Sequence, residues 1–222
     1  CSFEKLKEKA VLIYQSNEFT IEKCHFTDFE NSEAIRICEN SCGSIIDCTF
    51  EHFSTNMIYI KEKSDLLIKN NVFTDFGYPA IFVTEKSVAS IQNNILKNSL
   101  HNAIAIRGAH YIEIENTKIE DVEECAISVS DTNSCLIQKN EIFNCKNVSI
   151  ESYNGSDIIA KNNKIKNSGQ YAFYVYMKGQ IKAENNEIEN VNGAMVKLAE
   201  NGRGEFINNK IIKCQKLNDC ED

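Results

Sequence analysis

The sequence predicts an all-β solenoid, a chain of β-strands wound into stacked coils. Three observations predict this fold: a bias toward isoleucine and asparagine, a repeat of fixed length, and alternation of apolar and polar residues inside each repeat. There are 29 isoleucines against 9 leucines, with 27 asparagines and a single proline, Pro79. Because β-branched residues favour strands and asparagine favours turns, this composition indicates strands separated by many polar turns.

The repeat is clearest at the polar residue that follows each short isoleucine-rich run. Successive copies of this residue are 23 residues apart, with one step of 24 residues. The copies are Cys1, Cys24, Cys48, Asn71, Asn94, Thr117, Asn140, Asn163, Asn186 and Asn209. An apolar residue lies two places after each copy, so the register holds through the chain and predicts about nine coils.

A second series fills the other half of each repeat, with a small residue followed by alternating apolar residues. Clear copies begin at Ala34, Ala80 and Ala103, and weaker ones at Ser149 and Ala172. Comparison of the two series places the extra residue of the 24-residue step in a turn between residues 24 and 34. Both halves alternate with a period of two, which predicts two strands per coil, each with one side turned inward.

A leucine-rich repeat has a similar length and a similar apolar core pattern, so it is the competing architecture. The second half of such a repeat is a leucine-rich helix or 3₁₀ turn with helical spacing. Here the second half alternates as a strand and uses isoleucine and valine. The pattern therefore favours a parallel β-helix.

The repeats resemble those of right-handed parallel β-helix proteins, the pectin-lyase-like superfamily, and their intracellular relatives in certain F-box proteins and Shc-SH2-binding proteins. The resemblance covers residues 1–214, which we expect to form one domain, with residues 215–222 as a polar tail or partial C-terminal cap. The right hand of the coil follows from this resemblance and from the general handedness of crossovers between parallel strands. The resemblance does not imply one activity, because the scaffold carries lyases, hydrolases, epimerases and binding modules.

The asparagine row is expected to be structural. An asparagine at a sharp turn tolerates a left-handed backbone, and its amide can hydrogen-bond to the copies on the neighbouring coils. Stacked coils repeat about every 4.8 Å, so these copies lie directly above one another.

Charge and composition exclude several function classes. With 24 Lys and Arg against 32 Asp and Glu, the net charge of −8 is unfavourable for binding nucleic acid. No apolar run has the length of a membrane span, so no membrane partner is expected.

Cys1 in place of an initial methionine suggests a processed chain or part of a longer one, and other domains of that chain are expected partners. Ten cysteines without clustered histidines favour reduced thiols, no zinc and no cofactor, in a cytoplasmic protein, with secretion as the alternative.

The outward positions offer no catalytic cluster. Carbohydrate-active members of this superfamily gather carboxylates on neighbouring coils, whereas the outward rows of the second strand hold one acid, Glu151. On the first strand Glu113 and Glu115 share a face without a third partner. The acids Asp28, Asp75 and Asp121 occupy one turn row on alternate coils, about 10 Å apart, too far to share one calcium ion. We therefore expect no catalytic residue and no metal site.

A binding surface is better supported by the same outward rows. The candidate partner-binding residues are Tyr59, Phe82, Arg107, Tyr153, Tyr174 and Tyr176. Tyr59 and Phe82 are expected to stack on adjacent coils with Arg107 close by. Tyr153, Tyr174 and Tyr176 are expected to form a second aromatic group two coils further along. Outward aromatic rings with an arginine are typical of interaction hot spots. The sequence thus predicts a non-catalytic recognition module for a protein partner. The alternatives are a carbohydrate-binding or polysaccharide-degrading β-helix, and a structural spacer in a larger protein.

Overall fold

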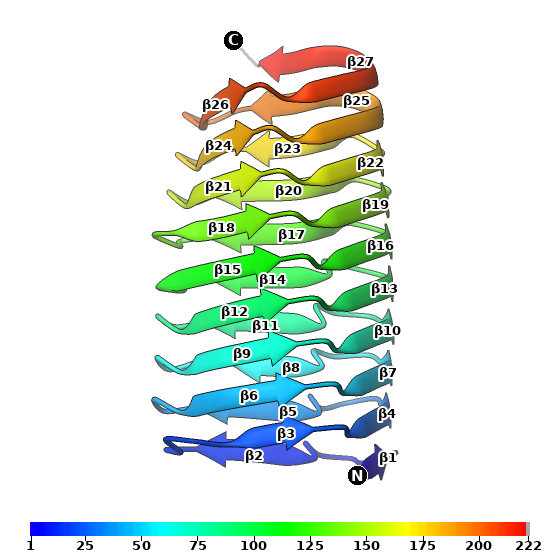
Figure 1. Ribbon diagram of the computed structural model, residues 1–222, viewed down its shortest axis with the longest axis vertical. Coiled ribbons are helices and arrows are strands. Elements are labelled where there is room, and N and C mark those ends of the chain that lie inside the picture. Colours follow the sequence, from blue (N-terminus) through cyan, green and yellow to red (C-terminus); the bar gives the residue numbers. More distant parts are fainter. Residues whose placement is uncertain (221–222) are drawn as a thin grey trace.

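The computed structural model describes residues 1–220, and the side chains of residues 1–216. It is a parallel β-helix whose coils climb from the N-terminus to the C-terminus (Figure 1). Each complete coil contains three strands, on three faces that we number in chain order. The prediction of two strands per coil was therefore wrong: the chain bends at the asparagine row, which divides the expected first strand into two.

The three faces are built from successive copies of the same strand. Face 1 contains β1 (Ser2–Glu4), β4 (His25–Phe29), β7 (Thr49–Phe53), β10 (Val72–Phe76), β13 (Ile95–Ser99), β16 (Lys118–Val122), β19 (Glu141–Cys145) and β22 (Lys164–Ser168). Face 2 contains β2 (Val11–Tyr14), β5 (Ile35–Cys38), β8 (Ile58–Ile60), β11 (Ile81–Thr84), β14 (Ile104–Arg107), β17 (Cys125–Ser130), β20 (Val148–Tyr153) and β23 (Tyr171–Val175). Face 3 contains β3 (Thr20–Glu22), β6 (Cys42–Ile46), β9 (Asp65–Lys69), β12 (Val88–Gln92), β15 (Tyr111–Glu115), β18 (Cys135–Gln138), β21 (Asp157–Lys161), β24 (Gln180–Glu184) and β26 (Arg203–Ile207). The long strands β25 (Glu187–Leu198) and β27 (Lys210–Cys220) continue from face 1 into face 2.

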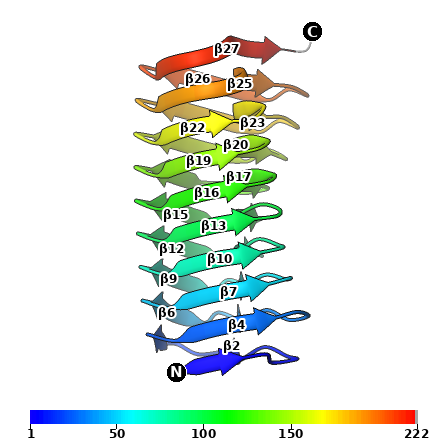
Figure 2. The ribbon, with the colours of Figure 1, turned by 90° about the vertical axis from the view of Figure 1, so that its right-hand side faces the viewer.

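Every strand pairs in parallel with its copy one coil away, as the repeat predicts. Figure 2 shows this ladder on face 1. Phe50 of β7 lies opposite Phe73 of β10, a separation of 23 residues, whereas Val11 of β2 lies opposite Ile35 of β5, a separation of 24 residues. Since Phe3 and Phe26 are still 23 residues apart, the extra residue lies between β4 and β5. This location confirms the prediction.

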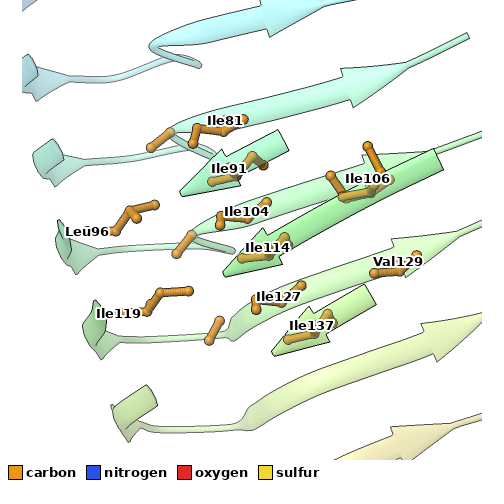
Figure 3. Packing of buried hydrophobic residues seen from close by; sticks show 14 of the residues in the cluster. Ile81, Ile91, Leu96, Ile104, Ile106, Ile114, Ile119, Ile127, Val129 and Ile137 are labelled. Atoms are coloured by element: carbon orange, nitrogen blue, oxygen red, sulfur yellow. The ribbon is translucent and has the colours of Figure 1, made fainter. Parts of the chain in front are cut away.

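The core is a set of vertical columns of apolar side chains. In one coil, Ile81 of β11, Ile91 of β12 and Leu96 of β13 point inward from the three faces, and the next coils repeat this arrangement (Figure 3). Toward the N-terminus, phenylalanines stack in two such columns, with Phe26 and Phe50 rings 4.8 Å apart. Burial of each such side chain stabilises the fold by roughly 1.5–3 kcal/mol before the cost of ordering the chain.

The asparagine row forms a buried ladder at the bend between faces 3 and 1. Asn71 Nδ2 donates to the main-chain oxygen of Ile45 and to Asn94 Oδ1, and Asn94 Oδ1 also accepts the main-chain N–H of Asn71. The structural role of the row is thereby confirmed. One detail differs: the left-handed backbone lies at the residue before each ladder position, as at Asn70 with a φ of 58°.

The C-terminal strand crosses the expected domain boundary. Strand β27 continues past Cys214 and pairs with β25 as far as Cys220, opposite Leu198. The division at residue 214 therefore stays a prediction, and the last two residues of the expected tail lie outside the described part of the chain. Within residues 1–220 the structure contains no helix of the length and apolar character that crossing a membrane requires.

Candidate functional site

The outward side of face 2 carries the residues that the sequence singled out. We call this surface the aromatic face. Strand register places its side chains in two columns, and the strand partners confirm that residues one repeat apart are vertical neighbours. The first column contains Leu12, Arg36, Tyr59, Phe82, Ala105, Ser128, Glu151, Tyr174 and Lys197. The second column includes Thr84, Arg107, Ser130 and Tyr153, with Tyr176 beyond them.

Tyr59 and Phe82 form the first aromatic group of this face. Their rings stack with centroids 5.2 Å apart and planes inclined by 12°. The arginine that contacts this pair is Arg36, whose guanidinium carbon lies 5.6 Å from the centre of the Tyr59 ring. Arg36 also forms an ion pair with Glu33. Sequence reasoning missed Arg36, although it occupies the coil next to Tyr59 in the same column.

Arg107 lies in the second column, between Thr84 and Ser130 on the neighbouring coils. It is exposed, and its side chain forms no ion pair or hydrogen bond with the rest of the described residues. The hydroxyl oxygens of Thr84 and Ser130 are buried and have no hydrogen-bond partner there. Register therefore places Arg107 beside two residues with unpaired hydroxyls, whereas the guanidinium over the Tyr59 ring is that of Arg36.

The three remaining predicted residues form one cluster. The Tyr153 and Tyr176 rings stack with centroids 5.1 Å apart, and the Tyr174 and Tyr176 centroids are 4.5 Å apart. Tyr171 extends the cluster, with its ring centre 5.7 Å from that of Tyr174. The signal for Tyr171 was present in the sequence as a third tyrosine within six residues. All four tyrosines are partly buried, and each ring contacts at least one other ring of the cluster.

Glu151 is held between the aromatic cluster and a serine. Ser128 Oγ donates to Glu151 Oε2 at 2.7 Å, and the Tyr176 hydroxyl donates to Glu151 Oε1 at 3.2 Å. Burial, followed by the adjacent Glu151 charge, raises the pKa of Tyr176. The phenol therefore stays a hydrogen-bond donor at neutral pH, and the carboxylate is an oriented acceptor with both oxygens occupied.

The acids on the other faces are also held by neighbours. Gln138 Nε2 donates to Glu113 Oε1 at 3.0 Å, and Lys139 Nζ lies 2.9 Å from Glu115 Oε1, partners that the sequence analysis did not foresee. Among the residues whose side chains are described, no group of three or more histidine, cysteine or acidic side chains has an arrangement that could hold a metal ion.

A groove that sequence reasoning missed lies where the strands of face 1 end and the turns toward face 2 begin. It has a volume of about 800 Å³ and contains the predicted acidic row of Asp28, Asp75 and Asp121. His52 bridges two of these acids, with Nδ1 3.2 Å from Asp28 Oδ1 and Nε2 3.7 Å from Asp75 Oδ2. We refer to it as the acidic groove.

The chain is similar to known β-helix proteins in sequence pattern and in structure. A family profile described as a right-handed β-helix region matches residues 1–99 and 33–188. No curated protein matches the sequence significantly. The surface adhesin PfbA of Streptococcus pneumoniae superposes with a TM-score of 0.66 at 14% identity, over 91% of this chain and 62% of the adhesin chain, so this chain spans less than two thirds of that length. The A-module of a mannuronan C-5 epimerase from Azotobacter vinelandii superposes with a TM-score of 0.65 at 12% identity, over 97% of this chain and 74% of the module. Because the sequence identities are this low, the two superpositions show a common fold alone.

Proposed function

We propose that this chain, which belongs to the right-handed β-helix family, is a non-catalytic recognition module that binds a protein partner across its aromatic face. The observation that carries the proposal is the pair of ring clusters on one sheet, Tyr59 with Phe82 and the tyrosines around Tyr176. Because the backbone beneath them is bonded on both sides to neighbouring coils, the rings are already ordered. Binding therefore loses little conformational entropy.

The chemistry of the face fits a protein partner. Tyrosine and arginine are among the residues enriched in hot spots, where a large ring excludes water and a guanidinium binds an acidic group. Arg107 has no internal partner, so its charge is available to a carboxylate.

The arrangement of acids supports a role without catalysis. General acid and base catalysis of glycosidic chemistry uses two carboxyl groups on opposite sides of the bond. In the two outward columns of the aromatic face, the acid is Glu151, and both of its oxygens accept hydrogen bonds from Ser128 and Tyr176. A second carboxylate in these two columns is missing among the described residues.

The test begins by identifying the partner. A photo-crosslinking amino acid placed at Phe82 would be activated in extracts of the source cells, and the crosslinked protein would be identified by mass spectrometry and purified. Its dissociation constant is then measured for the wild type and for Tyr174→Ser with Tyr176→Ser. Loss of two hot-spot rings is expected to weaken binding by about 30-fold or more.

The matched control is Tyr111→Ser with Phe143→Ser, which removes two outward rings from the other two faces. It should bind the partner as the wild type does. Equal affinity of the Tyr174 and Tyr176 variant, measured at a temperature at which it is folded, would contradict the proposal.

A second candidate function is carbohydrate binding or polysaccharide modification. Stacked rings such as Tyr59 and Phe82 are also suited to the apolar faces of sugars, and one structural neighbour is an epimerase of mannuronan. A glycan array and an assay for cleavage of acidic polysaccharides test this candidate. Glycan binding that disappears in the Tyr174 and Tyr176 variant would favour it over the protein partner.

Two finer expectations complete the proposal. We place the module in the cytoplasm, in a longer protein of the F-box or Shc-SH2-binding type, with nine described cysteines as free thiols in support. The full-length open reading frame tests this placement, since a signal peptide would contradict it.

If the chain is only a spacer, crosslinking at Phe82 would identify no partner, and replacement of the module by an unrelated rod of equal length would preserve function.

A further inference from the structure

The acidic groove is an apolar depression that crosses five consecutive coils. It follows the ends of β4, β7, β10, β13 and β16. Phe29, Phe53 and Phe76 line it from below and are almost fully buried, and most of its surface is apolar. Tyr78 and Leu100 project from the turns beside it and are 55% and 65% exposed. Two large apolar side chains at this exposure provide a surface that a bound ligand would cover.

Acidic side chains outnumber basic ones around this apolar surface, and the basic groups of the described lining are His52 and His101. Five carboxylates line the groove, from Asp28, Glu30, Asp75, Asp121 and Glu123, and the described lining includes no lysine or arginine. Lys146 reaches one end, where its Nζ lies 2.6 Å from Glu123. The other four acids form no ion pair with lysine or arginine among the described residues, but His52 bridges Asp28 and Asp75, and a basic ligand would take the place of its imidazole. A ligand that complements this groove is therefore cationic and carries apolar surface.

The spacing of the acids specifies the form of the ligand. Asp28, Asp75 and Asp121 occupy one row on alternate coils, with left-handed backbone at each (φ of 60°, 56° and 59°). Because coils repeat about every 4.8 Å, these carboxylates recur about every 10 Å along the groove. A peptide in the polyproline II conformation has three residues per turn and rises about 3.1 Å per residue, so every third side chain lies on the same side about 9 Å apart.

We propose that the acidic groove binds an extended, basic segment of a protein partner, with lysine or arginine at every third residue opposite Asp28, Asp75 and Asp121. Apolar residues between the basic ones pack on the exposed side chains of Tyr78 and Leu100. The groove belongs to the end of face 1 and its turns, so this inference does not depend on the aromatic face. It adds a second surface, with different chemistry, to the proposed recognition module.

The acid row can be neutralised without disturbing its backbone. Asn98, Asn144 and Asn167 occupy the same row with φ of 59°, 56° and 60°, so asparagine is a native residue at this position. Asn167 Nδ2 donates to Asn144 Oδ1 at 2.8 Å, as Asn98 Nδ2 donates to Asp75 Oδ1 at 2.9 Å. An asparagine at Asp75 therefore keeps the acceptor oxygen and removes only the charge.

The experiment measures fluorescence anisotropy of a labelled peptide in which lysine alternates with two prolines. We expect the wild type to bind it, and Asp28→Asn with Asp75→Asn to bind it about three- to tenfold more weakly at low salt. The control is Asp47→Asn with Asp131→Asn, which removes the same charge from two exposed left-handed positions outside the groove. The control should stay within about twofold of the wild type.

A second peptide separates register from simple charge attraction. It has the same composition, with its lysines grouped at one end, and should bind more weakly than the alternating peptide. The inference would be overturned by equal binding of the two peptides, by an equal loss in the Asp47 and Asp131 control, by equally effective competition from a free polyamine, or by no binding at about 1 mM peptide. None of these results bears on the rings of the aromatic face, so the two proposals can fail separately.

Discussion

Asn163 Nδ2 lies 3.0 Å from Asn186 Oδ1, one coil further along, and donates a second hydrogen bond to the main-chain oxygen of Ile137. The Oδ1 atom of Asn163 in turn accepts both the main-chain and the side-chain N–H of Asn140. One buried amide thus joins three coils at the bend between faces 3 and 1.

Asn163→Ala is therefore expected to destabilise the fold strongly. It leaves the Ile137 oxygen and the Asn140 amide groups buried without a partner, at a cost of about 3 kcal/mol or more in the free energy of unfolding. Denaturant unfolding followed by circular dichroism measures it. Asn163→Thr should cost less, because Thr117 already occupies this ladder and accepts from the Asn94 main chain. Equal stability of the alanine variant and the wild type would contradict the role assigned to the ladder.

The phenylalanine column gives a prediction for the core. Phe50 is fully buried between Phe26 and Phe73, with ring centroids 4.8 Å away on each side. Phe50→Ala should destabilise the protein by about 3–5 kcal/mol, because it leaves a cavity between two rings. Phe50→Leu should cost clearly less, since the same column continues with Leu96 opposite Phe73. Thermal and denaturant unfolding of the two variants check this order, and a leucine variant as unstable as the alanine variant would contradict it.

The cysteines are expected to differ sharply in reactivity. Burial raises the pKa of Cys145 to about 12, whereas Cys1 and Cys42 are exposed. Because the thiolate is the reactive form, Cys145 in the native protein at about pH 8 should react with a thiol reagent at least a thousandfold more slowly than an ordinary exposed cysteine. Mass spectrometry after brief labelling locates the modified residues, and Cys42→Ser should remove one fast site. Labelling of Cys145 before unfolding, at the rate of Cys42, would contradict the prediction.

Much of the fold could be predicted because a solenoid repeats the same structural unit once per coil. Nine copies of each position distinguish inward from outward residues even where single copies depart from the pattern. The third strand was missed although its signal was present. Ile68, Asn71 and Phe73 all point inward at spacings of three and two residues, and a straight strand cannot turn inward side chains three residues apart. The chain must bend before Asn71, at the left-handed Asn70.

The surface was only partly predictable. Column order along face 2 predicted the contact of Tyr59 with Phe82 and of Tyr153 with Tyr176, because vertical neighbours stack wherever register holds. Arg107 was placed near Phe82, but register sets it beside Thr84. The acidic groove was not foreseen because its walls are turns, and the course of a turn toward Tyr78 or Leu100 is not fixed by the strand repeat.

The Tyr176 hydroxyl supplies the last prediction, on pH dependence. Burial and the Glu151 charge raise the pKa of Tyr176, whereas an unfolded tyrosine loses its proton near pH 10. Above about pH 10 the unfolded state thus binds fewer protons than the folded state, and the free energy of unfolding falls as pH rises. Tyr176→Phe should remove this part of the pH dependence, and lose roughly 1 kcal/mol at neutral pH with the hydrogen bond to Glu151.

Glu151→Gln distinguishes the charge from burial. It removes the negative charge beside the phenol, so the pKa of Tyr176 should fall, while burial keeps it above the ordinary tyrosine value. Ultraviolet difference absorbance of tyrosinate in the folded protein follows this shift. If the titration of the variant equals that of the wild type, the Glu151 carboxylate does not act on Tyr176, and the contact between them would not orient the carboxylate on the aromatic face.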